Sequence, residues 1–301
     1  MKLDSLINKL SEQKIEYVKD EPMSRHTTFK IGGNADVLVK VKSSDELKQV
    51  LSFAAHYGVP YFILGKGSNL LVSDSGIEGI VISLTGFNDI AIDGSKVVCG
   101  AGASLRSVCL AVQKASLSGL EFAYGIPGTI GGALYMNAGA YGGEMSQVVV
   151  SATAVDKSGN EIELSLADMQ LGYRTSIFKS SELIITSVTF ELKVGDKESI
   201  KEAMDGFFAR RQDKQPLEFP SAGSTFKRPE GYFAGALIEQ NNLKGLSVGG
   251  AQVSEKHAGF VINTGNATCD DVLSLIQNIK DVVKKADGVT LEPEVIFVGR
   301  K

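Results

Sequence analysis

Residues 125–143 read GIPGTIGGALYMNAGAYGG, and seven of these 19 residues are glycine. The residues between the glycines are mostly apolar, whereas a flexible linker is rich in serine and other polar residues. Glycine has no Cβ, so a backbone of this composition can lie directly against a bound molecule. Pro127 stiffens the start of the stretch, and Asn137 offers both a hydrogen-bond donor and an acceptor. The stretch is typical of a loop that holds a flat ligand and its phosphates; a glycine-rich turn between two layers is the alternative.

A second loop, GKGSN at residues 65–69, follows the short apolar run at residues 61–64. Its two glycines allow backbone N–H groups to approach an anion closely, as diphosphate binding requires. It is not the dinucleotide fingerprint, because Leu70 stands where the third glycine would be, and it is not a Walker A loop, because Lys66 precedes Gly67. Alone, this loop favours a tight turn at the end of a strand. Together, the two loops predict a large, planar ligand that bears phosphates.

Two further segments offer polar side chains in unusual surroundings. Arg174 lies among aromatic and apolar neighbours in GYRTSIFK, residues 172–179. A planar guanidinium pairs well with a carboxylate or an enolate, although a surface arginine with a packed stem is as good an interpretation. Ser224 lies in SAGSTFKRP, residues 221–229, where small residues precede it and two cations follow it. A lone serine in a turn is usually structural, and the absence of Gly-x-Ser-x-Gly here argues against nucleophilic hydrolysis.

Glu294 lies in the last predicted strand, residues 289–298, with the same parity as Ile296 and Val298. It is therefore expected to point inward at the mouth of that strand. A carboxyl group buried there would have a raised pKa and could act as an acid, whereas a solvated strand end is the alternative.

Composition excludes several classes of protein. The 301 residues are 43% hydrophobic and 22% charged, which is typical of a globular chain with a sizeable core. The net charge of −4 gives no electrostatic footprint for nucleic acid. Three well-separated cysteines and three histidines form neither a disulfide framework nor a metal-ligand pattern. No apolar run is long enough to span a membrane, and the N-terminus does not resemble a signal peptide, so we expect a cytoplasmic protein.

The hydrophobic pattern mixes helix and strand. Capping boxes begin two helices, with Ser43 three residues before Glu46 and Thr268 three residues before Asp271. A polar stretch near Gly195 is the best domain boundary. The remaining expected helices are a short amphipathic one at the N-terminus and those at 104–117 and 200–211; the expected strands are 61–64, 79–83, 90–93, 96–99, 148–155, 161–164, 183–190 and 289–298.

Taken together, these segments resemble the UDP-N-acetylenolpyruvoylglucosamine reductase family, flavoenzymes of bacterial cell-wall precursor synthesis. The resemblance follows the chain in order. It is carried by RHTTFKIGG at 25–33, GKGSN at 65–69, GIPGTIGG at 125–132 with NAGAYG at 137–142, GYRTSIF at 172–178, SAGSTFK at 221–227 and LEPEV at 291–295. The first three groups occur in looser form in a wider FAD-binding fold, and the last three are specific to the reductase.

The resemblance implies an α+β fold. A two-lobed FAD-binding domain of the PCMH and vanillyl-alcohol-oxidase type would occupy residues 1–197, with lobes of about 1–82 and 83–197. A smaller α+β substrate-binding domain would occupy residues 198–301. Noncovalent FAD would be reduced by NADPH and would pass hydride to C3 of the enolpyruvyl ether, giving UDP-N-acetylmuramate. The length suggests the shorter subclass, which lacks an extra tyrosine-bearing loop over the substrate.

The resemblance also implies roles for individual residues. The catalytic residues would be Arg174 and Glu294, which stabilise the enolate, and Ser224, which gives a proton to C2. The expected cofactor contacts are Gly65, Lys66, Gly67, Ser68, Asn69, Gly125, Pro127, Gly128, Gly131, Gly132, Asn137, Gly139 and Ala140. The expected substrate contacts are Tyr173, Lys227, Arg228 and His257. The expected partners are a UDP-sugar and NADPH, with no metal, nucleic acid or membrane.

Two alternatives stay open at this point. One is another FAD-dependent oxidoreductase of the same fold that acts on a sugar or a hydroxy acid, which would not bind a UDP-sugar tightly. The other is a non-catalytic binder of nucleotide-sugars, which would lack the yellow colour of a flavin.

Overall fold

The computed structural model describes residues 2–300, which form two compact units. The first unit comprises residues up to 18, 37–66 and 79–210, and the second comprises residues 19–36, 67–78 and 211 onward. Met1 and Lys301, the outer ends of the two predicted domains, lie outside the described residues. The division at residues 197 and 198 therefore stays a prediction, and the chain crosses between the two compact units several times.

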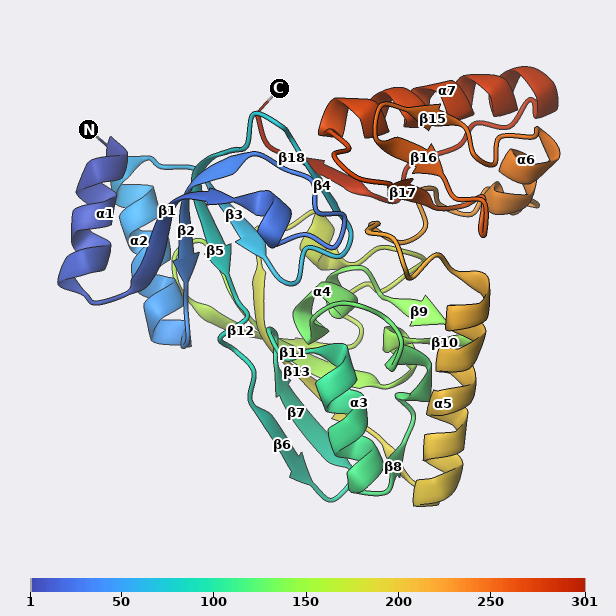
Figure 1. Cartoon of the computed structure of the whole chain (residues 1–301). Helices are drawn as coiled ribbons and strands as arrows, with labels where there is room; N and C mark the ends of the chain where they lie inside the picture. Colours follow the sequence, from blue (N-terminus) through green and yellow to red (C-terminus); the bar gives the residue numbers. More distant parts are fainter. Residues whose placement is uncertain (1, 301) are drawn as a thin grey trace. The chain divides into compact units, whose positions relative to one another are not determined.

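A four-stranded sheet has the order β1-β2-β5-β3, and most of its residues belong to the first unit. Its strands are β1 (Glu16–Pro22), β2 (Asn34–Lys40), β5 (Ile77–Ser83) and β3 (Tyr61–Leu64), and β3 runs parallel to β5. Two helices, α1 (Lys2–Glu12) and α2 (Ser44–Tyr57), lie side by side against it (Figure 1). Leu6 and Leu10 of α1 and Leu47 of α2 are fully buried, so their apolar faces supply the core of this part.

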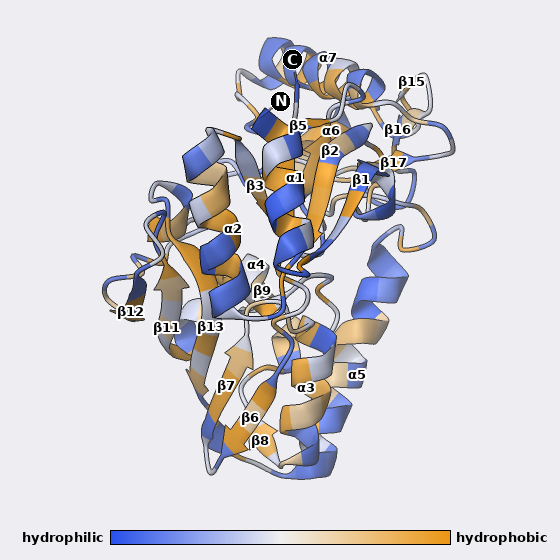
Figure 2. Ribbon diagram, turned by 90° about the vertical axis from the view of Figure 1, so that its left-hand side faces the viewer, coloured by the Kyte–Doolittle hydropathy of each residue, from blue (hydrophilic) through white to orange (hydrophobic). Residues whose placement is uncertain are grey.

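A five-stranded antiparallel sheet forms the rest of the first unit, in the order β12-β11-β13-β7-β6. The strands are β6 (Ile90–Asp93), β7 (Lys96–Gly100), β11 (Val149–Val155), β12 (Glu161–Ser165) and β13 (Ile184–Glu191). The helices α3 (Leu105–Lys114) and α4 (Ile130–Tyr135) pack on it, and α5 (Lys197–Lys214) is largely hydrophilic (Figure 2). Short pairs join β8 (Leu117–Ser118) to β14 (Lys193–Val194) and β9 (Gly139–Ala140) to β10 (Gly143–Glu144).

The second unit has its own core. Its three-stranded antiparallel sheet is β15 (Ser247–Val248), β16 (Ala251–Val253) and β17 (Val261–Asn263). The helices α6 (Ala234–Gln240) and α7 (Cys269–Asp287) are in contact with each other, and α7 packs on β15 and β16. The last strand, β18 (Ile296–Val298), pairs in parallel with β4 (Leu70–Val72), which brings the end of the chain beside residues from its first quarter.

The capped helices are confirmed. The Ser43 side chain accepts a hydrogen bond from the N–H of Glu46, and Gly58 ends α2 with a φ of +61°. The Glu46 carboxylate accepts the N–H of Lys42 instead of that of Ser43, so only the Ser43 half of this predicted capping box forms. Thr268 and Asp271 form the predicted capping box of α7. Each cap satisfies N–H groups that a helix leaves without an internal partner, which is why these two helix starts could be placed from sequence. The mixed helix and strand content confirms the α+β class.

Three element predictions were wrong in part. Residues 125–143 were expected as a loop but contain α4, because Thr129 caps its first turn and because Ile130 and Gly131 donate to the carbonyls of Ala103 and Ala101. The last strand covers only Ile296–Val298 of the expected 289–298. The helix expected at 104–117 ends at Lys114, since the chain turns there into β8.

Candidate active site

The two glycine-rich loops meet in the first unit. A Cβ placed on Gly65 would lie 2.7 Å from the hydroxyl of Thr129, the residue that caps α4. Backbone of the 65–69 loop can approach α4 this closely only because residue 65 has no side chain. The two segments that predicted a common ligand from sequence are therefore neighbours in the structure.

The loop at residues 65–69 presents a row of available donors. Gly67 has a φ of +61°, and in the second unit a Cβ on it would lie 2.1 Å from the carbonyl oxygen of His26. Within the described chain, the backbone N–H groups of Gly65, Lys66, Gly67 and Ser68 donate to no protein acceptor. Consecutive free N–H groups in such a turn form a concave anion site. This feature fits the diphosphate of a dinucleotide cofactor.

The glycines of residues 125–143 divide into two groups. Gly131 and Gly139 are required by packing within the unit, because a Cβ would lie 2.8 Å from the Ala101 side chain and 2.7 Å from the Gly143 carbonyl, respectively. Gly132, by contrast, is exposed, as is the neighbouring Pro127, and both leave backbone open to a ligand. The glycine pattern thus encodes both tight packing and an accessible surface, which sequence alone could not separate.

Asn137 connects this segment to the turn that carries Arg174. Its side chain is buried, donating to the carbonyl of Gly172 at 3.0 Å and accepting from the N–H of Ser146 at 3.0 Å. Nearby, the buried hydroxyl of Ser176 donates to the carbonyl of Tyr135 at 2.7 Å. The structure therefore gives the Asn137 amide a supporting role, and a direct contact with cofactor stays a prediction. Ser176 was missed from sequence, because nothing local distinguishes it from a surface serine.

Arg174 lies in a tight turn with a strained backbone. Gly172 and Thr175 exchange two backbone hydrogen bonds of 3.1 and 3.2 Å, and Arg174 between them has a φ of +54°. A non-glycine residue in this region costs roughly 1–2 kcal/mol, and such strain gathers at functional sites. The Arg174 guanidinium lies 5.4 Å from the ring centre of Tyr173, which is 56% exposed, and Lys179 donates to the Arg174 carbonyl at 2.9 Å.

Ser224 and Glu294 lie on neighbouring segments of the second unit. The N–H of Glu294 donates to the carbonyl of Thr225 at 2.8 Å, and the N–H of Lys227 donates to the carbonyl of Glu292 at 2.9 Å. Residues 225–227 and 292–294 therefore run antiparallel. Ser224 is exposed and Glu294 is half-buried, and the inward orientation expected for Glu294 stays a prediction. Residues 289–295 form only an isolated bridge instead of the regular strand that the parity assumed.

The same cluster includes Asn69 and two of the predicted substrate contacts. The Asn69 amide donates to the carbonyl of Glu294 at 3.1 Å, so this predicted cofactor residue supports the Glu294 backbone. Lys227 forms an ion pair of 3.0 Å with Glu292. The guanidinium of Arg228 lies 4.0 Å from the ring centre of Phe233, which is 60% exposed.

His257 belongs to this cluster through Gly259. Its Nδ1 accepts the N–H of Gly259 at 3.1 Å, and Gly259 in turn accepts the N–H of Thr225 at 2.9 Å. Burial lowers the pKa of His257 below its usual value of 6.5. The ring is therefore neutral at pH 7, and because Nδ1 accepts, its proton resides on Nε2.

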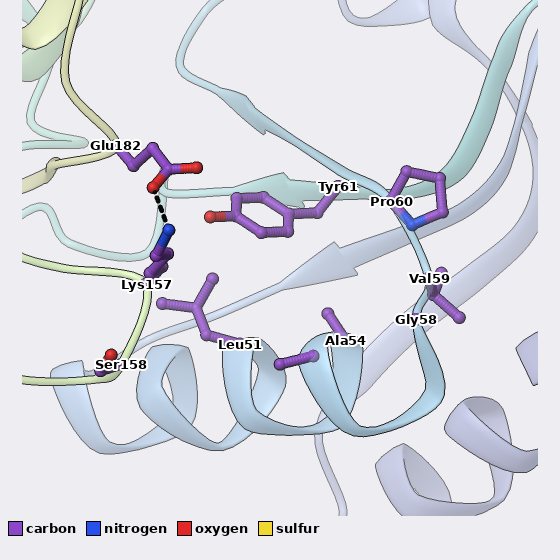
Figure 3. Close-up of a pocket in the computed structure, with 10 residues that line it drawn as sticks. Leu51, Ala54, Gly58, Val59, Pro60, Tyr61, Lys157, Ser158 and Glu182 are labelled. Carbon is purple, nitrogen blue, oxygen red and sulfur yellow. Dashed lines mark ion pairs between the residues drawn. The ribbon is translucent and has the colours of Figure 1, made fainter.

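A cavity of about 590 Å³ lies elsewhere in the first unit (Figure 3). It is lined by the end of α2 and by Tyr61, with the ion pair of Lys157 and Glu182 at 2.7 Å on its rim. Burial raises the pKa of Tyr61. None of the predicted site residues lines this cavity, so it is separate from the candidate active site.

Comparison with known proteins identifies the family of the chain. Residues 215–298 match the sequence model of the UDP-N-acetylenolpyruvoylglucosamine reductase C-terminal domain, and residues 35–165 match an FAD binding domain. The chain is 50% identical over 298 residues to UDP-N-acetylenolpyruvoylglucosamine reductase of Caldanaerobacter subterraneus subsp. tengcongensis, covering 98% of this chain and 99% of that protein. The chain belongs to the UDP-N-acetylenolpyruvoylglucosamine reductase family.

Further members of the reductase family give the same result. The enzyme of Clostridium perfringens strain SM101 is 50% identical over 93% of this chain and 92% of its own length. The crystal structure of the reductase from Thermus caldophilus superposes with a TM-score of 0.81 at 34% identity, covering 94% of this chain and 98% of that chain. This match confirms the reductase fold over nearly the whole chain.

Other structural findings bear on the remaining expectations. Among residues 2–300, no group of three or more histidine, cysteine, aspartate or glutamate side chains is arranged to hold a metal ion. Over the same residues, no helix is both long enough and apolar enough to cross a membrane. The three cysteines are all free and buried.

Proposed function

We propose that this protein reduces UDP-N-acetylglucosamine enolpyruvate to UDP-N-acetylmuramate, a step of peptidoglycan precursor synthesis, with FAD as its cofactor and NADPH as its reductant. The observation that carries the proposal is the 50% identity to a reductase of this name over 98% of the chain. In the overall reaction NADPH supplies a hydride to C3 of the enolpyruvyl group and solvent supplies a proton to C2. The two alternatives from sequence are displaced by this family membership.

The residues present fit FAD. The free N–H groups at Gly65–Ser68 suit its diphosphate, and the exposed backbone at Gly132 lies in the neighbouring segment. When bound, FAD carries the hydride between NADPH and the enolpyruvyl carbon. Residues 125–143 contain neither histidine nor cysteine, so we assign noncovalent binding. The chain's own contribution is to hold the two loops together through Gly65 and Thr129.

Arg174 is assigned to the substrate carboxylate. Charge develops on C2 and the carboxylate as C3 is reduced, and a preorganised donor aimed at such charge contributes about 3–4 kcal/mol in comparable sites. The turn at Gly172–Thr175 fixes the backbone from which the guanidinium extends, and its φ of +54° shows that this position is held against a local preference. Glu294, in its protonated form, is assigned as a second donor to the same charge.

Ser224 is assigned as the group that gives a proton to C2. Its neighbours Ala222 and Gly223 are small, and Ser224 itself is exposed, so a ligand can reach the hydroxyl. A serine hydroxyl is a weak acid and needs a cation or a relay to solvent once it has lost its proton. Lys227 is a candidate for that stabilisation, although it would first have to exchange its ion pair with Glu292.

The substrate's nucleotide is assigned to the remaining side chains. Arg228 and Lys227 provide positive charge for its diphosphate. Tyr173 provides an exposed ring, and His257 provides a neutral Nε2–H donor.

We assign residues 1–197 to FAD binding and residues 198–301 to substrate binding. We also place the protein in the cytoplasm, because all three of its thiols are unpaired.

Product analysis tests the proposed function. Purified protein is incubated with NADPH and UDP-N-acetylglucosamine enolpyruvate, and the product is examined by mass spectrometry and proton NMR. A gain of two hydrogens at C2 and C3, in equal amount to the NADPH consumed, is expected. A protein that consumes NADPH without changing this substrate, or that instead oxidises a sugar or hydroxy acid, would contradict the proposal.

A further inference from the structure

Thr225 uses every polar group it has to join three segments of the second unit. Its N–H donates to the carbonyl of Gly259 at 2.9 Å, and its carbonyl accepts the N–H of Glu294 at 2.8 Å. Its hydroxyl accepts the N–H of Val261 at 2.9 Å. The side chain is only 5% exposed, so these bonds are shielded from water.

The segments joined in this way are those that carry the proposed site. Ser224 is the residue before Thr225, Glu294 is bonded to it directly, and His257 is bonded to Gly259. Two more bonds support the same register, from Lys227 to the Glu292 carbonyl and from the Asn69 amide to the Glu294 carbonyl. The separation of Ser224 from Glu294 along the chain is large, so their relative position depends on this junction.

Of the three hydrogen bonds of Thr225, only the one between its hydroxyl and the N–H of Val261 depends on the side chain. Valine has nearly the same shape as threonine but cannot accept the Val261 N–H, which lies at a residue that is 1% exposed. Leaving a buried donor unpaired is costly, so the 259–261 segment would shift to find a partner. Serine keeps the acceptor and loses only a methyl group.

We propose that Thr225 is a positioning residue that sets the geometry of Ser224 and Glu294 toward the substrate through its hydrogen bond to Val261. Thr225 itself acts through these neighbours and does not touch the reacting atoms. This inference rests on the proposed function, since it assumes that Ser224 and Glu294 act on the enolpyruvyl group. A displacement of about 1 Å at a reacting group lowers a rate roughly 10²-fold.

Stopped-flow absorbance of the bound flavin separates the two half-reactions in the FAD-loaded protein. In Thr225→Val, flavin reduction by NADPH is expected to stay near the wild-type rate, while reoxidation by saturating enolpyruvyl substrate slows roughly 10²-fold. Thr225→Ser is expected to stay near the wild-type rate in both steps. Calorimetry of UDP-N-acetylmuramate binding is expected to give Thr225→Val a Kd within about threefold of the wild-type value. This corresponds to a difference in binding free energy of less than about 0.7 kcal/mol.

A matched control is available in the same unit. The hydroxyl of Thr264 donates to the Gly250 carbonyl at 2.9 Å outside the Thr225 cluster, so Thr264→Val is expected to leave both half-reactions unchanged. Reoxidation of Thr225→Val at the wild-type rate would overturn the inference. Equal slowing of flavin reduction and reoxidation in Thr225→Val would also overturn it. The same holds if the Kd for UDP-N-acetylmuramate rises as much as the reoxidation rate falls, or if Thr225→Ser is reoxidised as slowly as Thr225→Val.

Failure of this inference can be told apart from failure of the proposed function. If the wild-type flavin is not reoxidised by the enolpyruvyl substrate, the proposed function fails, whatever Thr225 does. If wild type is reoxidised and Thr225→Val is equally fast, only the positioning role fails. If Thr225→Val does not fold, Thr225→Ala removes the same hydroxyl with less crowding, and the same comparison with Thr225→Ser decides the outcome.

Discussion

Arg174 and Ser224, the residues proposed to act on the substrate, lie in contrasting local structures. Arg174 sits at a φ of +54°, which arginine adopts only when the surrounding turn imposes it. Ser224 is exposed and lies beside a buried threonine that joins three segments. In both cases the side chain proposed to act is exposed or extends from a turn, and the residues beside it are fixed.

Replacing Arg174 by lysine keeps the charge but loses the planar fork that can bind a carboxylate through two hydrogen bonds. We expect Arg174→Lys to slow flavin reoxidation by the enolpyruvyl substrate by about 10²–10³-fold, the usual effect of removing one preorganised donor. Flavin reduction by NADPH in the same sample serves as the internal control and is expected to be unaffected. Wild-type turnover of this variant at saturating substrate would remove Arg174 from the mechanism.

Replacing Ser224 by alanine tests the proton donor. We expect FAD binding and flavin reduction to be nearly unchanged, because neither requires a proton at C2. Reoxidation by substrate should slow by roughly 10²–10⁴, which is about 2.7–5.5 kcal/mol of barrier. Ser224→Cys should recover part of the loss, since a thiol can also donate. If Ser224→Ala slowed flavin reduction but left reoxidation unchanged, a water molecule or Glu294 would have to be the donor.

His257 predicts a pH dependence of stability. Burial lowers its pKa in the folded protein below the 6.5 of the unfolded chain, so folding favours the neutral ring. This contribution is complete above pH 6.5 and is lost as the pH falls through the lower, folded pKa. We expect the thermal midpoint of His257→Gln to fall less steeply than that of wild type between pH 6.5 and pH 5. The thermal midpoints are measured by differential scanning fluorimetry. If those of wild type and His257→Gln change equally with pH, the lowered pKa of His257 would be contradicted.

At the scale of elements, replacing a glycine within a helix can lower or raise the stability of the protein, depending on the neighbours of that glycine. Gly131 in α4 has no room for a Cβ, which would lie 2.8 Å from Ala101, whereas Gly206 in α5 has nothing within 4 Å. We expect Gly131→Ala to destabilise the protein by about 1–3 kcal/mol through overpacking and to weaken FAD retention. Gly206→Ala is the matched control and is expected to stabilise it by about 0.5–1 kcal/mol.

These two changes can be compared by denaturant titration and by the ratio of flavin to protein absorbance after gel filtration. Equal stability of the two variants would mean that α4 does not pack on Ala101 as the structure shows. Full flavin retention in Gly131→Ala, despite lost stability, would mean that α4 is not part of the cofactor site.

Elements with local signals were predictable from sequence. The caps at Ser43 and Thr268 fixed the starts of α2 and α7, since cap chemistry lies within a few residues. By contrast, α4 contains two adjacent glycines, which disfavour helix, and exists because bonds to Ala101 and Ala103 hold it. No local pattern could show those partners.

The candidate site was predictable only in part for the same reason. Its exposed residues stood out as motifs, whereas the groups that hold them, such as Thr225 and Ser176, act through partners distant in the chain. The regular strand expected around Glu294 does not form, because Pro293 lacks an N–H and the segment makes only an isolated bridge to Phe226.

At the scale of the whole molecule, both cores contain buried thiols. Burial raises the pKa of Cys99, Cys109 and Cys269 to about 12, so each is a protonated, unreactive thiol near neutral pH. We expect Ellman's reagent at pH 8 to label none of them in the native protein and all three after denaturation. Rapid labelling of a native thiol would show that one of the cores opens readily.

The proposed function is tested most directly by two anaerobic additions to the purified, flavin-loaded protein. NADPH is added first, and flavin absorbance near 450 nm is expected to fall as about one equivalent is consumed. UDP-N-acetylglucosamine enolpyruvate is then added without oxygen, and the absorbance is expected to return as UDP-N-acetylmuramate forms in equal amount. A flavin that NADPH reduces but this substrate does not reoxidise would contradict the assignment as a reductase of the enolpyruvyl group.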